Sequence, residues 1–130
     1  MPLPASARTF ITLAGISGFL MVALGAFGAH LLENAISVDQ LKVWETAVKY
    51  QMVHTVALLA LALLFFWKSN GALRWAGWLF VEGIVLFSGS LYIYAVTDIS
   101  WLGMITPFGG IAFLVAWVLL IVGSLQKRSS

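Results

Sequence analysis

Four long apolar runs, separated by short polar segments, dominate the chain. They extend over residues 10–32, 41–67, 72–96 and 107–125. A helix needs about 20 mostly apolar residues to cross the hydrocarbon core of a bilayer, and each run comes close to that length or exceeds it. Because 62% of the 130 residues are hydrophobic and only 9% are charged, the chain lacks the charged side chains that cover a soluble domain. The sequence therefore predicts an all-α fold: residues 1–130 form one integral-membrane domain, a four-span transmembrane helix bundle.

A cleaved signal peptide is the competing interpretation of the first run. Ala26-Phe27-Gly28 loosely resembles a cleavage site with small residues. The run, however, is longer than the apolar part of a signal peptide, which has about 7–15 residues. It is also rich in glycine, which suits a helix packed against other helices in a membrane. We therefore expect the first run to be a retained span.

The distribution of charge predicts the orientation of the bundle, because Lys and Arg mark the cytoplasmic ends of membrane helices. Five of the seven basic residues fall on one side of the predicted membrane: Arg8, Lys68, Arg74, Lys127 and Arg128. The loops on the other side carry acidic residues: Glu33, Asp39 and Asp98. Lys42 and Lys49, the exceptions, lie within the second span. The prediction is that both termini lie in the cytoplasm.

Composition and residue types argue against several classes of function. The basic residues are too few and too scattered for a nucleic-acid surface. The absence of cysteine excludes disulfides and thiolate chemistry. No set of residues has the spacing of a metal site, and no serine, histidine and carboxylate share one depth. We therefore expect a non-enzymatic protein and predict no catalytic residue, no metal and no cofactor.

The uncommon polar residues of the spans lie mostly in the outer half of the predicted membrane. They form the candidate site: His30, Tyr50, Gln51, His54, Ser88, Ser90, Tyr92 and Thr106. On the second span, the Tyr50/Gln51/His54 face lies opposite the charged side chains and should point into the bundle. Two interpretations stay open: these residues join the helices by hydrogen bonds, or they line a small polar pocket whose ligand is unknown.

The start of the fourth span bears on the pocket interpretation. Thr106 is the expected N-cap and Pro107 the first helical residue. The positive end of that helix, at residues 106–110, would favour an anion or a carbonyl group.

Glycines and one acid are the remaining features of the spans. Small residues let helices approach closely in lipid, and the glycines expected to act in this way are Gly18, Gly25, Gly28, Gly89, Gly109 and Gly110.

Glu82 is the one acidic residue deep within a span, where an ionised carboxylate is costly. It is interpreted as a neutral structural residue, as part of a proton or ion pathway, or as a contact in a homo-oligomer. Arg74 on its own helix and His54 on another are the candidate partners.

Two further functions are alternatives to a role of the candidate site in helix packing or ligand binding. An oligomeric channel or transporter component for protons or a small solute would need Glu82 as a stepping stone through the apolar inner half. A haem-binding bundle would use His30 and His54, which differ in depth.

Four motifs occur in order along the chain: Gly25-Ala26-Phe27-Gly28-Ala29-His30; Tyr50 with His54; Phe87-Ser88-Gly89-Ser90-Leu91-Tyr92; and Thr106-Pro107-Phe108-Gly109-Gly110 with Trp117. Together they resemble an uncharacterised family of small four-span bacterial inner-membrane proteins, which has a small transmembrane relative in animals. The resemblance covers nearly the whole chain. It implies a four-helix, multi-pass protein of the bacterial inner membrane. Apart from the resemblance, the apolar spans make membrane lipid the expected partner, and the sequence leaves a homo-oligomer open as a second one. The resemblance implies no activity, and Glu82 is not part of the family pattern.

Overall fold

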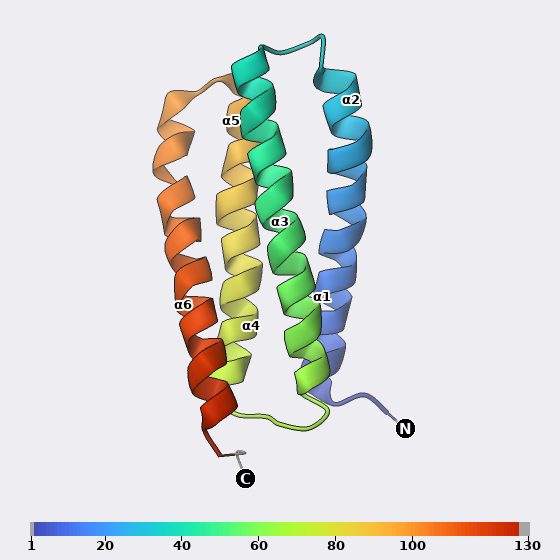
Figure 1. The fold of residues 1–130 in the computed structure, drawn as a ribbon, viewed down its shortest axis with the longest axis vertical. Coiled ribbons are helices and arrows are strands. Elements are labelled where there is room, and N and C mark those ends of the chain that lie inside the picture. The colour runs from blue at the N-terminus through green and yellow to red at the C-terminus, as the bar shows by residue number, and fades with distance from the viewer. Residues whose placement is uncertain (1, 128–130) are drawn as a thin grey trace.

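The computed structural model describes residues 2–127 and forms a bundle of four long helical segments (Figure 1). The elements, in chain order, are α1 (Ala5–Val22), the π-helical segment η1 (Ala23–Gly28), α2 (Ala29–Leu32), α3 (Val38–Leu64), α4 (Gly71–Gly83), the π-helical segment η2 (Ile84–Ser88), α5 (Gly89–Thr97), the 3-10 segment η3 (Ser100–Met104) and α6 (Thr106–Leu125). No strand occurs among the described residues. The all-α prediction is confirmed.

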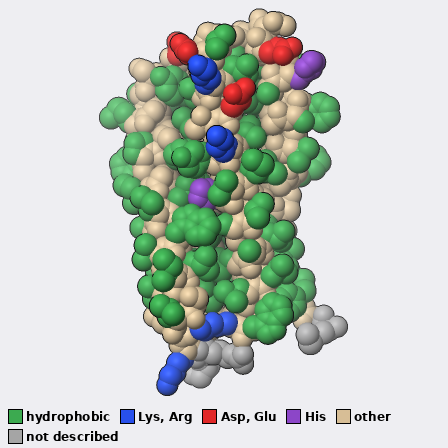
Figure 2. Space-filling model, in the orientation of Figure 1, with side chains coloured by type: hydrophobic (Ala, Val, Ile, Leu, Met, Phe, Trp, Pro, Cys, Tyr) green, Lys and Arg blue, Asp and Glu red, His purple; other side chains and the backbone are tan. Residues whose placement is uncertain are grey.

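Four helical segments are long and apolar enough to cross a membrane, which confirms the prediction of a four-span bundle: Ala5–Leu32, Val38–Leu64, Gly71–Thr97 and Ser100–Leu125. Both chain ends lie at the same end of the bundle (Figure 1). On the face that Figure 2 shows, charged side chains gather toward the two ends and hydrophobic ones fill the middle. The cytoplasmic placement of the termini stays a prediction, and Arg128, on which it partly rests, lies outside the described residues.

The helices pair unevenly. α1 packs mainly on α3, and α6 packs mainly on α4 and η2, while α3 lies against α4, η2 and α5. The apolar core lies toward the end of the bundle that holds the termini, where Phe10, Leu58, Leu61, Leu73 and Phe80 are almost completely buried. Because α1 has little contact with α4, and α3 has little with α6, the bundle leaves grooves between both of these pairs.

Side-chain caps and turns set the helix ends. α3 begins at Val38, ahead of the apolar run, because Ser37 and Gln40 form a reciprocal capping box: each side chain bonds the other's backbone N–H, at 3.1 and 3.0 Å. Asn70 caps α4 by accepting the N–H of Leu73 at 3.0 Å, and it donates to the Gly123 carbonyl of α6 at 2.9 Å. These side chains satisfy backbone groups that the helix ends would otherwise leave without partners.

The start of α6 differs from the prediction. The N-cap is Ile105 rather than Thr106, and it makes no side-chain cap. The reason is that η3 leads directly into α6: the N–H of Ile105 bonds the Leu102 carbonyl at 3.1 Å, and the N–H of Phe108 bonds the Ile105 carbonyl at 3.0 Å. The 3-10 turn thus takes the place of a cap, and the Thr106 hydroxyl bonds Ser90 instead.

Two π-helical segments interrupt the long helices, and neither is predicted from the sequence. η1 contains Gly25 to Gly28 of the first motif, and η2 ends with Phe87 and Ser88 of the third. A π-helical turn is wider than an α-helical turn and rotates the residues that follow it. Both segments pack on α3, so they determine which side chains of the first and third spans reach it.

Candidate functional site

Gln51 of α3 is the centre of a hydrogen-bond network that joins three spans. Its Oε1 accepts the Tyr92 hydroxyl of α5 at 2.6 Å. Its Nε2 donates to the backbone carbonyl and the hydroxyl of Ser17 on α1, at 3.1 and 3.2 Å. The Ser17 hydroxyl in turn shares a hydrogen bond of 2.7 Å with the hydroxyl of Thr55. Gln51 is only 4% exposed, so its whole amide group is used to bind helix to helix.

The serines of the third span make two further links. Ser88, which is 1% exposed, donates to the Ala47 carbonyl of α3 at 2.7 Å. Ser90 donates to the Phe87 carbonyl at 3.0 Å and bonds the Thr106 hydroxyl of α6 at 2.6 Å. Both hydroxyls are thus engaged within the protein. They hold η2 against α3 and the start of α6 against α5.

His54 is held in one tautomer by its two ring nitrogens. An indole N–H can only donate, and that of Trp117 points at Nε2 of His54 at 3.1 Å, so Nε2 carries no proton. Nδ1 lies 2.7 Å from the Tyr50 carbonyl and donates its proton there. The ring also stacks on Phe113, with centroids 3.5 Å apart and planes at 7°. The imidazole is therefore neutral, and it links α3 to α6.

An open groove lies between α3 and α6 beside His54. Its volume is about 540 Å³ and its walls are almost entirely apolar. It is lined by Tyr50, Val53, His54, Phe87, Pro107, Gly110, Ile111, Phe113, Leu114 and Trp117. A hollow of about 270 Å³, lined by Lys49, Tyr50, Val53 and His54, shares three of these residues. We call the two together the α3/α6 groove. Residues of the second, third and fourth motifs thus converge on one surface.

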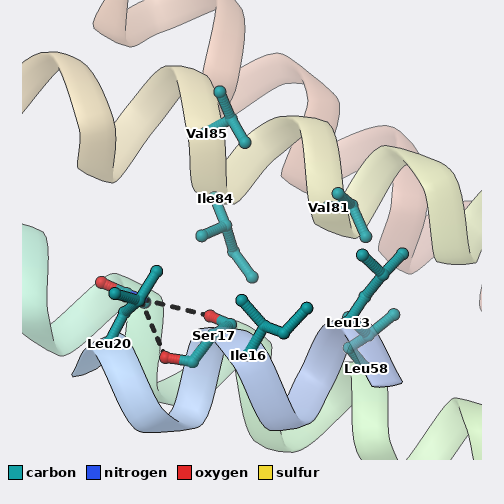
Figure 3. A pocket seen from close by; sticks show the side chains of 9 residues that line it. Leu13, Ile16, Ser17, Leu20, Leu58, Val81, Ile84 and Val85 are labelled. Carbon is teal, nitrogen blue, oxygen red and sulfur yellow. Dashed lines mark hydrogen bonds between the residues drawn. The ribbon is translucent and has the colours of Figure 1, made fainter. Parts of the chain in front are cut away.

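A smaller groove lies on the other side of the bundle, between α1 and α4. It has a volume of about 170 Å³ and is lined mainly by aliphatic side chains. Ile84 of η2 points across it toward Ile16 of α1, and the bonds of Ser17 lie along its floor (Figure 3). The polar atoms of this groove already bond one another, so the groove offers an apolar surface.

Two residues of the predicted cluster lie apart from the buried network. His30 is at the far end of the first span, where its side chain is 79% exposed and its Nδ1 lies 3.9 Å from Glu33. Tyr50 is 41% exposed and packs on Phe87, with ring centroids 4.5 Å apart. The inward orientation predicted for the Tyr50/Gln51/His54 face thus holds for Gln51 and His54, whereas Tyr50 lies at the rim of the groove. Residues four apart differ by about 40° around a helix, which is the reason for this difference.

Glu82 lies on the outer surface of α4. Its side chain is exposed, and no other described residue bonds it. Phe80, two residues earlier, is fully buried and its ring contacts that of His54. Two residues turn a helix by about 200°, so Glu82 points away from the bundle and from His54. Arg74 lies eight residues earlier on the same helix, about 12 Å away at the helical rise, and its Nη1 donates to the Ser69 hydroxyl instead.

The predicted packing glycines divide into two groups. A Cβ at Gly28 would come within 2.6 Å of the Trp44 ring, and one at Gly25 within 3.0 Å of Val48. At Gly109 it would overlap the backbone of Phe87, so helices approach closely at these three positions. A Cβ at Gly18 or Gly110 would make only ordinary van der Waals contacts, and a Cβ at Gly89 would meet no atom within 4 Å. The structure thus gives Gly89 no close helix contact.

Several residues that hold the site together are not predicted from the sequence. Ser17 and Thr55 complete the Gln51 network. Trp44 donates its indole N–H to the Leu24 carbonyl in η1 at 2.9 Å. Trp117, which bonds His54, does carry a sequence signal, its place in the fourth motif. For Ser17 and Thr55 the available signal is that a hydroxyl within a span must find a partner in the protein, and the same holds for the indole N–H of Trp44.

The arrangement limits the chemistry that the described residues offer. His30 and His54 do not converge, and the described residues contain no group of three or more His, Cys, Asp or Glu that could hold a metal. Neither Ser88 nor Ser90 bonds His54, whose two nitrogens bond Trp117 and Tyr50. The polar groups of the site therefore bond one another, and the α3/α6 groove remains as the open surface beside them.

Comparisons with known proteins agree with this architecture. Residues 24–110 match the family described as "Protein of unknown function (DUF423)". The chain is 49% identical over 120 residues to the UPF0382 membrane protein YwdK of Bacillus subtilis, covering 92% of this chain and 98% of that protein. It is 38% identical over 123 residues to the UPF0382 inner membrane protein YgdD of Escherichia coli, covering 95% and 94% of the two chains.

No solved structure matches the chain. The names of the relatives and the four apolar helices together establish a multi-pass protein of the inner membrane. Neither the family description nor the names of these relatives indicate an enzymatic activity. The chain belongs to this family of small membrane proteins of unestablished function, described as DUF423.

Proposed function

We propose that the protein is a non-enzymatic membrane protein that binds one anionic lipid in the α3/α6 groove. The observation that carries the proposal is the groove itself. It has a volume of about 540 Å³ and apolar walls, and it lies between two helices that otherwise have little contact. This volume falls in the range of ligand sites, roughly 300–1,000 Å³. Along α6 the groove runs from Pro107 to Trp117, which is about 15 Å at the helical rise. That is about half of the 30 Å hydrocarbon core, so the groove matches one leaflet.

The polar end of the groove supports a lipid with a negative headgroup. Lys49 and Tyr50 line the hollow that joins the groove, and among the described residues neither the Lys49 ammonium nor the Tyr50 hydroxyl has a hydrogen-bond partner. Side chains on a helix lean toward its N-terminus, and the N-terminus of α3 lies at the end away from the chain termini (Figure 1). Lys49 can therefore extend toward the interface, where a lipid phosphate lies.

The non-enzymatic part of the proposal rests on the hydrogen bonds of the groove and its surroundings. The hydroxyls of Ser88 and Ser90 and the Nε2 of His54 bond groups of other helices. The Nδ1 of His54 bonds the Tyr50 carbonyl of its own helix. A nucleophile or base would have to leave these bonds before it could act. The buried aromatic and aliphatic side chains of the core likewise argue against a water-filled path through a single copy.

The test measures how much phosphatidylglycerol the purified protein retains in native mass spectrometry. Gly110→Leu should reduce the bound fraction at least about tenfold, because a Cβ there meets only Phe87, at 3.9 Å, and a larger side chain would fill the groove. Lys49→Gln should weaken the binding of phosphatidylglycerol more than the binding of phosphatidylethanolamine. Gly15→Leu is the matched control, since a Cβ at this exposed position of α1 meets nothing within 4 Å. Equal lipid retention by the Gly110 and Gly15 variants would contradict the proposal.

A further inference from the structure

The outer face of α4 carries a carboxyl group without a partner deep in the membrane-spanning part of the bundle. Glu82 lies about 16 Å from the start of α4 and about 22 Å from the end of α5, measured at the helical rise. In a bilayer with a hydrocarbon core of about 30 Å, both distances place the residue within the core. Its side chain is exposed, and no described residue bonds it.

The surroundings of Glu82 on this face are apolar. Trp78 and Val85, four residues before it and three after, are 49% and 63% exposed and flank it. Lipid tails have no hydrogen-bonding groups, so a carboxyl group that faces them is unsatisfied in either protonation state. The chain therefore presents a polar group that only another polar group at the same depth can satisfy.

We propose that a second copy of this chain covers this face, with the Glu82 carboxyls of the two copies bonded to each other. Copies that share one orientation in the membrane are related by a twofold axis along the membrane normal, which places identical residues at identical depth. Glu82 points directly away from the core of its own bundle, so two α4 helices that meet bring the two carboxyls together. A protonated carboxyl donates its O–H to its counterpart, whereas two ionised ones would repel.

This interface is independent of the α3/α6 groove. Phe80, which contacts His54 beside the groove, lies on the opposite side of α4 from Glu82. The dimer would therefore leave the groove open in both copies. Failure of the lipid proposal would not remove the dimer, and the reverse is equally true.

The test uses the natural absence of cysteine from the chain. Single variants Trp78→Cys and Val85→Cys are purified, reconstituted into vesicles of phosphatidylethanolamine and phosphatidylglycerol, and treated with a short bis-maleimide. Val56→Cys on α3 and Ile121→Cys on α6 are controls, since both side chains are similarly exposed, at 60% and 59%. We expect dimer bands for the two α4 positions and little for the controls. Equal cross-linking at all four positions would overturn the proposal.

The role of the carboxyl is tested in the Val85→Cys background. Glu82→Gln should keep the dimer, because two amides can bond each other, whereas Glu82→Leu should lower the dimerisation constant at least about threefold, which converts to about 0.6 kcal/mol, the average for a side-chain hydrogen bond in a membrane. Glu82 has no contact that folding needs, so circular dichroism should be unchanged. An unchanged dimer in Glu82→Leu would refute the pairing. A cross-linked product in native membranes whose mass differs from that of the dimer would show that another protein covers the face, and would overturn the proposal.

Discussion

Replacing Gln51 by leucine tests whether the buried polar side chains stabilise the bundle. Leucine fills much of the same space and makes no hydrogen bond. The change removes the bond from the Tyr92 hydroxyl and the two bonds to Ser17, each between 2.6 and 3.2 Å. It also leaves the Tyr92 hydroxyl without an acceptor.

The cost can be worked from these bonds. Side-chain hydrogen bonds in membrane proteins average about 0.6 kcal/mol, so three of them give about 2 kcal/mol. An unsatisfied buried polar group adds about 1–3 kcal/mol. Because the Tyr92 hydroxyl is only partly buried, the lower end of that range applies, and Gln51→Leu should lower the free energy of unfolding by about 2–4 kcal/mol. Tyr92→Phe alone should cost about 0.6–1.7 kcal/mol.

The assay is equilibrium unfolding in mixed micelles by titration with sodium dodecyl sulfate, followed by tryptophan fluorescence. The double variant should cost less than the sum of the two single variants by at least about 0.5 kcal/mol, because both lose the same bond. Met52→Leu, at a neighbouring exposed position, is the control and should change stability by less than about 0.5 kcal/mol. Additive effects of the two single variants, or equal effects of Gln51→Leu and the control, would show that the Gln51 network does not stabilise the bundle.

Other positions give equally direct tests. Gly109→Ala should destabilise the bundle by about 1–3 kcal/mol in thermal unfolding, since the new Cβ would overlap the backbone of Phe87. Gly89→Ala is the control and should leave the stability unchanged. Equal stability of the two variants would contradict the close approach of α6 to η2 at Gly109. The nitrogen-15 spectrum of His54 at neutral pH should show the tautomer protonated at Nδ1. Trp117→Phe should shift the Nε2 signal and cost about 1 kcal/mol; an Nε2-protonated ring in the unaltered protein would be inconsistent with the structure.

Much of the architecture could be predicted from the sequence because the bilayer permits few alternatives. An apolar run of about 20 residues must satisfy its own backbone, so it forms a helix. The same reasoning places Gln51 and His54 inside, where partners exist. It also explains why the polar residues of the third and fourth spans meet those of the second.

The features that the sequence does not predict depend on local geometry, which the periodicity of apolar residues does not reveal. The π-helical segment η2, whose last residue Ser88 donates to the Ala47 carbonyl of α3, changes the phase of the third span. A regular period of 3.6 residues does not predict that change of phase. Depth alone groups His30 with the other polar residues, but the first span reaches the end of the bundle there, and the His30 side chain is 79% exposed. Thr106 is a residue type that commonly caps helices, but the 3-10 segment η3 leads directly into α6 and takes the place of a side-chain cap.

Photo-cross-linking with phosphatidylglycerol that carries a diazirine in one acyl chain maps where a lipid tail lies on the protein, and so tests whether the α3/α6 groove binds lipid. Purified protein in vesicles is irradiated, digested and analysed by mass spectrometry. We predict adducts concentrated on the walls of the α3/α6 groove, at Val53, Ile111 and Leu114, and their loss in Gly110→Leu. Adducts spread evenly over the exposed faces of all four spans, with no effect of that substitution, would contradict lipid binding in the groove.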